Sequence, residues 1–289
     1  MKKSFRFTAL TVASVLCLGA MTACGGSSSS TSAASSASSA SSAASEASSA
    51  SSASSASSEA EVTSLESIVF GTNAEFAPFE YVSSTEGVIG EYDGIDMAIA
   101  SKIGEELDAD VSVENMEFDS LLVALQNGQI DAVIAGMTVT EERAKTVDFS
   151  TPYYTATQVM IVKEDSDITK ATDMEGKNIA VVQGYTGETV VDELGYEYTA
   201  FKKGTECVLD LINGKSDVVV IDSATAQKYV SDNEGLKVVE DADAFGDEEY
   251  AIAVSKDNPE LLSQINGVIE KLLEDGTISE IAAEYIDNI

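Results

Sequence analysis

The 289-residue sequence predicts an α/β fold made of two similar lobes, each a mostly parallel sheet flanked by helices. Short apolar runs alternate with segments of helical periodicity from residue 65 onwards. In addition, residues 122–136 and 208–222 align without gaps, and each contains a helical segment, an Asn-Gly stop signal and an apolar strand. Ligands bind outside the carboxyl ends of the strands in open α/β sheets, so two such lobes would enclose a binding cleft.

The N-terminal 23 residues are predicted to be an export signal, because three basic side chains precede an apolar run at residues 7–20. That run is too short to be a dependable membrane span. The tetrapeptide Met-Thr-Ala-Cys ending at Cys24 resembles a bacterial lipobox, which implies cleavage before Cys24 and a lipid on its sulfur. The alternative is an ordinary secretory signal. Residues 24–64 consist mostly of Ser and Ala and are predicted to be a flexible, lipid-anchored linker.

Composition excludes several functions. The net charge of −34 argues against nucleic-acid binding and against electrostatic adhesion to anionic lipid. It also means that an anionic ligand needs a local cation. The absence of histidine excludes Ser-His-Asp and Cys-His catalysis and removes the commonest zinc ligand. Once the signal is removed and Cys24 carries lipid, Cys207 is the remaining cysteine and cannot form an intramolecular disulfide.

Lobe 1 is assigned to residues 65–154 and 249–289. Residues 94–107 are predicted to be a helix because their apolar positions recur at helical spacing, and the helix at 118–126 ends at Asn-Gly. Residues 73–81 form an aromatic loop held by a proline, followed by a turn at 83–87. The predicted strands are Ser67–Thr72, 111–116, 132–135 and 250–254, and the C-terminal helices are Pro259–Glu274 and 277–285.

Lobe 2 is assigned to residues 155–248. Its predicted strands are 159–163, 178–183 and 217–221, the last ending at Asp222, with a turn at 173–177. A helix at 207–212 again closes at Asn-Gly.

Residues 131–154 are the centre of the predicted site. A buried strand leads to Gly136, and Thr140 is a plausible N-cap of a following helix. Arg143 does not fit a first helical turn, because a cation there opposes the helix dipole by a few tenths of a kcal/mol. It therefore either extends into solvent or holds an anion. Its place beside Gly136 and Thr138, at the carboxyl end of a strand, favours the anion.

Several segments together resemble the polar amino-acid substrate-binding proteins (family 3) of ABC importers. They are residues 76–81, 128–131, 135–143, 147–154, 184–187 and 275–277, and the resemblance extends over residues 65–286. It implies a type II periplasmic-binding-protein fold whose lobes are joined by a two-segment hinge and close on a ligand. It also implies a monomeric, extracytoplasmic receptor without a cofactor that delivers a free amino acid to membrane permease subunits.

An α-amino acid offers a carboxylate and an ammonium group. Arg143 provides a planar, permanently charged fork for the carboxylate. The resemblance adds the backbone N–H groups of Thr138 and Gly187. It also places the Gly136 carbonyl, the Thr138 hydroxyl and the Asp222 carboxylate around the ammonium group, with Asp222 on the lobe opposite Arg143.

The resemblance assigns Phe76 and Phe118 to the walls of the pocket for the ligand side chain. The uncharged residues Asn73 and Gln183 then favour a neutral, polar amino acid, whereas Glu75 keeps a basic one open. Ala135 and Thr186, from the same motifs, complete the candidate ligand-binding set.

Two other classes of function remain. A dehydratase of small carboxylic acids on the same scaffold would need a proton-transferring carboxyl group, for which Glu75 and Glu188 are candidates. A sensor module would need a signalling partner. Residues 241–246 begin like a calcium loop, but Phe245 and Ile252 occupy ligand positions, so an acidic turn and no metal site is expected.

Overall fold

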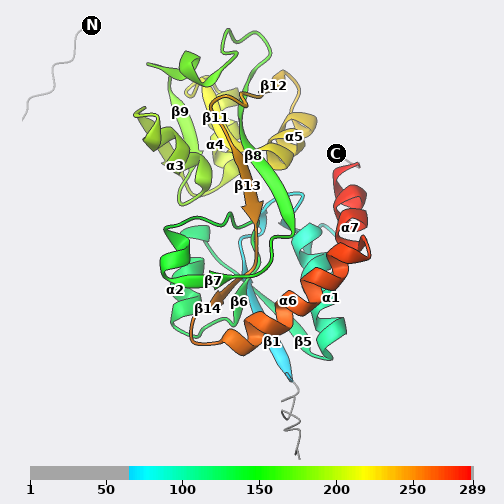
Figure 1. The fold of residues 1–289 in the computed structure, drawn as a ribbon. Helices are drawn as coiled ribbons and strands as arrows, with labels where there is room; N and C mark the ends of the chain where they lie inside the picture. The colour runs from blue at the N-terminus through cyan, green and yellow to red at the C-terminus, as the bar shows by residue number, and fades with distance from the viewer. Residues whose placement is uncertain (1–64, 288–289) are drawn as a thin grey trace, which may run out of the picture. The chain divides into compact units, whose positions relative to one another are not determined.

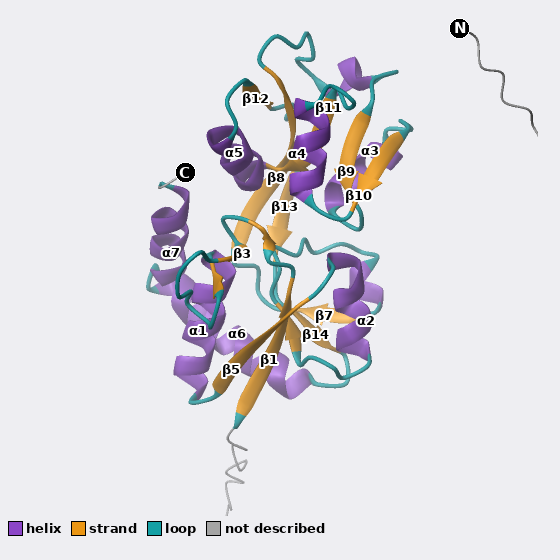
Figure 2. Cartoon of the chain, turned by 180° about the vertical axis from the view of Figure 1, so that it is seen from behind, coloured by secondary structure: helices purple, strands orange, loops and turns teal. Residues whose placement is uncertain are grey.

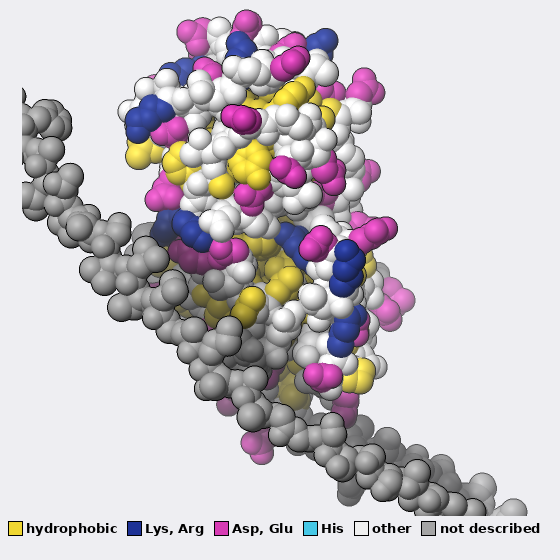
Figure 3. Space-filling model, turned by 90° about the vertical axis from the view of Figure 1, so that its left-hand side faces the viewer, with side chains coloured by type: hydrophobic (Ala, Val, Ile, Leu, Met, Phe, Trp, Pro, Cys, Tyr) yellow, Lys and Arg dark blue, Asp and Glu magenta, His cyan; other side chains and the backbone are white. Residues whose placement is uncertain are grey.

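The computed structural model describes residues 65–287, which form two α/β lobes (Figure 1). The predicted export signal, Cys24 and the Ser/Ala-rich linker lie outside the described residues. Among residues 65–287, no helix is both long and apolar enough to cross a membrane. Acidic side chains are scattered over the uncovered part of the face shown in Figure 3, as expected from 50 acidic and 16 basic residues.

The sheet of lobe 1 is mixed. β1 lies between β5 and β6 and is parallel to both, whereas β14 runs antiparallel to β6 and β7. The strands are β1 (Ser67–Thr72), β5 (Asp110–Asn115), β6 (Ala132–Val133), β7 (Val147–Phe149) and β14 (Ala253–Ser255), in the order β5-β1-β6-β14-β7. A small separate sheet joins β2 (Glu75–Phe76), β3 (Glu80–Val82) and β4 (Tyr92–Asp93) within the predicted aromatic loop and beyond it.

Helices cover both faces of this sheet (Figure 2). Because side chains alternate along a strand, Ile68 and Phe70 face one group of helices while Val69 faces another. The first group is α1 (Ile95–Leu107), α6 (Pro259–Glu274) and α7 (Thr277–Ile286), and the second face is covered by α2 (Leu121–Gln126). Short 3₁₀ turns, η1 (Phe118–Ser120) and η2 (Arg143–Lys145), complete the lobe.

The beginning of α6 illustrates how local sequence determines an element. The Asn258 side chain accepts a hydrogen bond from the Leu261 N–H, and Pro259 occupies a first-turn position where a missing N–H costs nothing. Leu261, Ile265 and Ile269 then recur at helical spacing and are buried against the sheet.

Lobe 2 is also built on a mixed sheet. β9 lies parallel to β10 and β11, whereas β8 runs antiparallel to β11 and β12. The strands are β8 (Tyr154–Lys163), β9 (Ile179–Val182), β10 (Tyr198–Phe201), β11 (Val218–Asp222), β12 (Leu236–Val239) and β13 (Asp247–Tyr250). The helices are α3 (Thr186–Glu193), α4 (Gly204–Ile212) and α5 (Ser223–Asp232), with a 3₁₀ turn η3 (Ala171–Met174). α4 and α5 pack on the opposite face of the sheet from α3.

The two segments that cross between the lobes are paired with each other. β8 and β13 form an antiparallel ladder from Tyr154 opposite Tyr250 to Thr157 opposite Asp247. On the lobe 1 side, the Ser150 N–H donates to the Ile252 carbonyl. The predicted two-segment hinge is therefore a two-stranded ribbon, visible between the lobes in Figure 1.

The internal repeat is present in three dimensions. α2 and α4 both end at an Asn-Gly pair, and the glycines Gly128 and Gly214 adopt positive φ angles of 66° and 71°. After the Asn-Gly pair, each repeat continues into a strand that joins a parallel pair: β6 lies parallel to β1, and β11 lies parallel to β9.

The matching aspartates of the two repeats make the same contact. Asp131 Oδ2 accepts a hydrogen bond of 2.8 Å from the Val69 N–H, and Asp217 Oδ2 accepts one of 2.8 Å from the Asn178 N–H. Each carboxylate therefore fixes the start of its strand to the neighbouring strand.

Some elements differ from the prediction. Thr140 is not the N-cap of an α-helix: its Oγ1 accepts from the Arg143 N–H at 3.2 Å, but the segment forms the short 3₁₀ turn η2, whose N-cap is Glu142. The sequence analysis did not identify α3 or α5, which follow directly after strand ends. Cys207 is buried and unpaired, as expected for a lone cysteine.

Candidate functional site

Seven of the eleven predicted site residues line one pocket of about 200 Å³ between the lobes. Lobe 1 contributes residues from β2, from the turns η1 and η2 and from the segment after β6, and lobe 2 contributes residues at the carboxyl ends of β9 and β11. The pocket is lined by Phe76, Phe118, Ala135, Gly136, Arg143, Tyr185, Thr186 and Asp222. Among these, Tyr185 is the residue that the sequence analysis did not name.

The Arg143 guanidinium lies between the lobes. Its Nη1 donates to the Thr138 carbonyl at 2.7 Å, and its Nη2 donates to the Gly184 carbonyl of lobe 2 at 3.0 Å. The guanidinium carbon also lies 5.2 Å from the centre of the Phe118 ring, within cation–π range. Within residues 65–287 Arg143 forms no ion pair, so its charge remains free for an anion.

Asp222 is buried at the end of β11, on the lobe opposite Arg143, as predicted. Its Oδ1 accepts a hydrogen bond of 2.6 Å from the Tyr250 hydroxyl group. Tyr250 comes from the crossing strand β13 and is fully buried. Asp222 is thus held by a hinge residue while its carboxylate lines the pocket.

Glu248 is a second acid beside the pocket. Its Oε2 accepts from the Thr138 hydroxyl at 2.8 Å and from the Gln158 side-chain amide at 3.3 Å. The Thr186 hydroxyl lies 3.0 Å from that of Thr138. Groups from both lobes and both crossing strands therefore form one polar network beside Arg143.

Burial governs the charges in this network. It raises the pKa of Asp222 to about 7, and repulsion from Glu248 acts in the same direction. Burial also raises the pKa of Glu248, although hydrogen bonds from Thr138 and Gln158 oppose the change. Burial lowers the pKa of Arg143, and the two acids counteract it. A ligand ammonium group beside these acids would relieve their repulsion.

The aromatic end of the pocket is closely packed. The Tyr185 ring centre lies 4.7 Å from that of Phe118 and 5.3 Å from that of Phe76, both edge-on. The Tyr185 hydroxyl donates to Asn73 Oδ1 at 2.8 Å, and the Asn73 amide donates to the Met116 carbonyl at 2.9 Å. Asn73 thus lies at this end, bound to Tyr185.

Other predicted residues have different surroundings. Gln183 is exposed and does not line the pocket. Gly187 is buried, and a Cβ atom there would lie 2.7 Å from the Val220 carbonyl oxygen, so packing alone requires glycine. The two candidate acids of an enzyme are engaged elsewhere: Glu75 accepts from Lys203 at 2.6 Å, and Glu188 from the Gly184 N–H at 2.6 Å.

Two missed residues could have been found from the alternation of a strand. Glu248 and Tyr250 are two positions apart on β13, so both point to the same side, whereas Asp247 and Glu249 are exposed. A tyrosine and an acid on one face of a crossing strand indicate an inward-facing pair. Gln158 is buried within β8, where a polar residue interrupts an apolar run.

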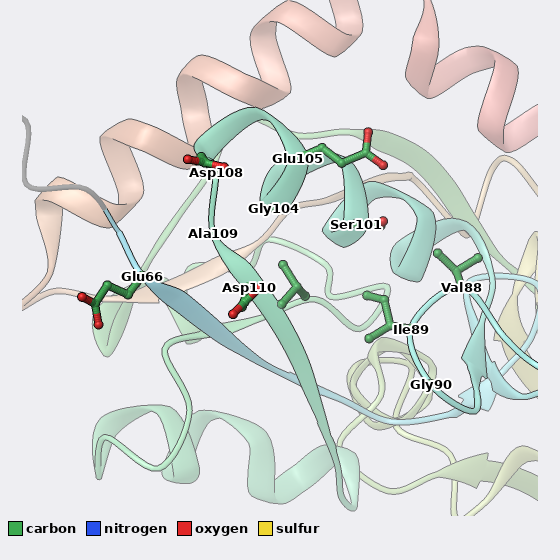
Figure 4. A pocket seen from close by; sticks show the side chains of 11 residues that line it. Glu66, Val88, Ile89, Gly90, Ser101, Gly104, Glu105, Asp108, Ala109 and Asp110 are labelled. Carbon is green, nitrogen blue, oxygen red and sulfur yellow. The ribbon is translucent and has the colours of Figure 1, made fainter.

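A wider hollow lies away from this site. Figure 4 shows a depression beside α1 and β5 with an empty volume of about 1040 Å³. Its lining includes Glu66, Glu105, Asp108 and Asp110 but no Lys or Arg, so it offers nothing to a carboxylate. Within residues 65–287, no cluster of three or more acidic or Cys side chains could hold a metal ion.

Comparison with known proteins gives a consistent result. The model for bacterial extracellular solute-binding proteins, family 3, matches residues 68–288. A probable histidine-binding protein of Neisseria gonorrhoeae is 34% identical over 221 residues, covering 74% of this chain and 81% of that protein. The arginine-binding extracellular protein ArtP of Bacillus subtilis is 30% identical over 225 residues, covering 76% and 86%.

A solved structure has the same fold. The arginine-, lysine-, histidine-binding protein ArtJ from Geobacillus stearothermophilus has a TM-score of 0.71 and 33% sequence identity, and the match covers 76% of this chain and 95% of that one. The family match at residues 68–288 extends over both lobes. The chain belongs to the bacterial extracellular solute-binding proteins, family 3.

Proposed function

We propose that this chain captures a free α-amino acid between its two lobes and delivers it to the permease of an ABC importer. Membership of the family makes it an extracytoplasmic transport receptor and not an enzyme. The observation that carries the proposal is one pocket of about 200 Å³ lined by a cation of one lobe and an acid of the other. Arg143 and Asp222 match the two opposite charges of an amino-acid zwitterion.

Each polar group of the site then has a role. The ligand carboxylate replaces a backbone carbonyl as a partner of Arg143, and the backbone N–H groups of Thr138 and Gly187 assist. The ammonium group lies among the Gly136 carbonyl, the Thr138 hydroxyl and Asp222. Because these groups come from both lobes, the ligand binds the closed form and shifts the population towards it.

We propose that the ligand side chain is neutral. Asn73 is uncharged and already bound, while Glu75 is paired with Lys203. Glu75 is therefore not free to pair with a basic side chain. The two named relatives are described as binding histidine and arginine, so the neutral side chain is proposed from the pocket residues and not from these relatives.

The remaining features are proposals of the same kind. Residues 65–154 with 249–289 form one lobe and residues 155–248 the other, and the protein acts as a monomer. Cys24 carries the lipid that attaches the receptor to the outer face of the membrane through the linker at 24–64. Radiolabelled palmitate incorporation that disappears in Cys24→Ala would test the anchor.

Isothermal titration of the chain with the twenty amino acids tests the function. We expect at least one to bind more tightly than millimolar, and Arg143→Ala to lose this binding by about 2–5 kcal/mol. The matched control is Lys145→Ala, which removes an exposed cation from the same 3₁₀ turn and should leave the affinity unchanged. Binding that survives in Arg143→Ala, or equal losses in both variants, would contradict the site assignment.

A further inference from the structure

Tyr185 has a backbone position that is fixed at the edge of the pocket. It lies between β9 and α3, and the carbonyl of the preceding Gly184 accepts a hydrogen bond from Arg143. The following residue, Thr186, lines the pocket. The direction of the Tyr185 side chain therefore decides how much of the cleft remains for a ligand.

The Tyr185 ring occupies the place predicted for a ligand side chain. It lies edge-on to Phe76 and Phe118, the two predicted pocket walls, and its hydroxyl group donates to Asn73, the predicted polar end. The ring is 6% exposed. The hydroxyl belongs to lobe 2 and Asn73 to lobe 1, so the phenol is fixed across the cleft when the lobes are together.

The space that Tyr185 leaves is small and lies at the charged end. About 200 Å³ of empty space remains, open solvent included, and the part that a water-sized sphere can enter is about 10 Å³, roughly the room of one water molecule. Arg143, Gly136 and Asp222 line it, so the groups proposed for the carboxylate and the ammonium lie at this end. The pocket has no space for a long ligand side chain beyond the α-carbon.

The acids near the closed end are Glu75, which is paired with Lys203, and the buried Glu80. The Asn73 amide is satisfied on both sides, by the Met116 carbonyl and by Tyr185. Burial raises the pKa of Tyr185 well above its ordinary value, so the phenol stays neutral. A guanidinium side chain would therefore be desolvated there beside Glu75, which is already paired, and a carboxylate side chain would be repelled by these acids.

We propose that Tyr185 determines specificity by filling the side-chain end of the pocket, which restricts the ligand to small uncharged α-amino acids such as glycine, alanine or serine. The inference rests on the proposed function, because it assumes that Arg143 and Asp222 hold the zwitterion. A longer side chain binds only if the Tyr185 ring leaves its contacts with Phe76, Phe118 and Asn73.

The test is titration of the full chain with glycine, alanine, serine, glutamine and arginine. For the native sequence we expect the tightest of the three small amino acids to bind at least about 100-fold more tightly than arginine. In Tyr185→Ala we expect this ratio to fall below about tenfold, because the space for a long side chain opens. Tyr185→Phe keeps the ring volume and is expected to keep excluding arginine, which separates ring volume from the hydrogen bond to Asn73.

Tyr196→Ala is the matched control, because this tyrosine of lobe 2 packs in the other core cluster of the lobe and does not line the pocket. It should leave the order of ligands unchanged, and thermal unfolding of each variant reports whether it folds. If Tyr185→Ala does not fold, the order of ligand affinities in the native chain and in Tyr185→Phe still tests the specificity role of Tyr185. Arginine binding to the native chain as tightly as alanine overturns the specificity role of Tyr185 while leaving the receptor function intact. Failure of all twenty amino acids to bind overturns the proposed function and this inference together.

Discussion

Glu80 and Asp96 form a buried pair of acids beneath the pocket. Asp96 Oδ2 accepts a hydrogen bond of 2.7 Å from the Gly136 N–H, and both of its oxygens lie 2.9 Å from the Tyr153 hydroxyl group. Burial, and next the charge of Asp96, raises the pKa of Glu80 well above its usual value. This favours the protonated form of Glu80, whose two carboxyl oxygens are buried without a hydrogen-bond partner among residues 65–287, while Asp96 holds the N–H group of the pocket residue Gly136.

Glu80→Gln should consequently be tolerated. The amide replaces a neutral carboxylic acid of the same shape, so we expect unfolding free energy at pH 7 within about 1 kcal/mol of the native value. Glu80→Ala should cost about 2–4 kcal/mol, because it leaves a cavity. Urea unfolding of both variants measures this. Equal destabilisation by the two substitutions would mean that Glu80 is ionised.

The pH dependence of stability follows from Asp96 and Asp222. Burial raises the pKa of each to about 7 from an ordinary value near 4. A raised carboxyl pKa means that the folded state holds its proton more tightly, so this stability is complete below pH 4 and is lost as pH rises through 7. Each group contributes at most about 1.4 kcal/mol per pH unit.

We therefore expect the urea midpoint to fall between pH 5.5 and 8, a window in which exposed carboxylates no longer titrate. Asp96→Asn should reduce the slope, and Asp96→Asn with Asp222→Asn should reduce it further, leaving the part due to Glu80 and Glu248, whose pKa values are also raised. A midpoint that is flat in the native chain would show that neither group holds a proton in the folded state.

Ligand binding should have the opposite dependence on pH. Asp222 must lose its proton before it can hold an ammonium group, so affinity should fall by up to about tenfold per unit as pH drops below 7. Titration calorimetry at pH 5.5, 6.5 and 8 measures this. Asp222→Asn, whose side chain does not titrate, should bind weakly and equally at all three; unchanged native affinity at pH 5.5 would argue against Asp222 as the ammonium partner.

At the scale of elements, two ion pairs join the lobes at the mouth of the cleft. Lys203, after β10, binds Glu75 of β2 at 2.6 Å, and Lys202 binds Asp119 of η1 at 2.7 Å. Partly exposed pairs contribute about 0.2–1 kcal/mol each. Because these pairs join residues of different lobes, opening of the cleft separates them.

Replacing both Lys202 and Lys203 by Ala should therefore weaken ligand binding by about two- to tenfold without changing the fold. The matched control is Lys102→Ala, which breaks a pair with Glu105 inside one helix. Small-angle scattering of the ligand-free double variant should show a larger radius of gyration than the native chain. Identical affinity and scattering would mean that the pairs do not hold the lobes together.

The sequence predicted the elements with strong patterns and missed those that depend on context. The helices ended by Asn-Gly and the capped α6 carry their own signals. α3 contains a glycine and two adjacent valines, residues with weak helical propensity, and it forms because Val191 packs into the lobe 2 core. Tertiary packing therefore decided this element.

The charged residues of the candidate site could be predicted from the sequence, whereas the shape of the pocket could not. Arg143 and Asp222 follow strands whose ends converge, so their meeting could be expected. Gln183 and Tyr185 flank Gly184, whose φ of 81° turns the chain so that the tyrosine is buried and the glutamine exposed. That orientation depends on how the two lobes fit together, which no local pattern contains.

At the scale of the whole molecule, the net charge of −34 should oppose the compact state. Screening by salt reduces this repulsion within the Debye length, about 8–10 Å near physiological ionic strength. We expect the melting temperature to rise by a few degrees between 0.01 and 0.3 M NaCl and then to level off. A melting temperature that falls over this range would contradict net repulsion.

The repeated helix–strand unit has a consequence for how such receptors change over generations. Both copies anchor their strand with an aspartate at the near end, and the far end carries Gly136 in one half and Asp222 in the other. The residues that build the repeated helix–strand unit are thus distinct from the residues that line the pocket. A single substitution at the end of either strand would therefore change the ligand specificity of the receptor and leave the supporting fold unchanged.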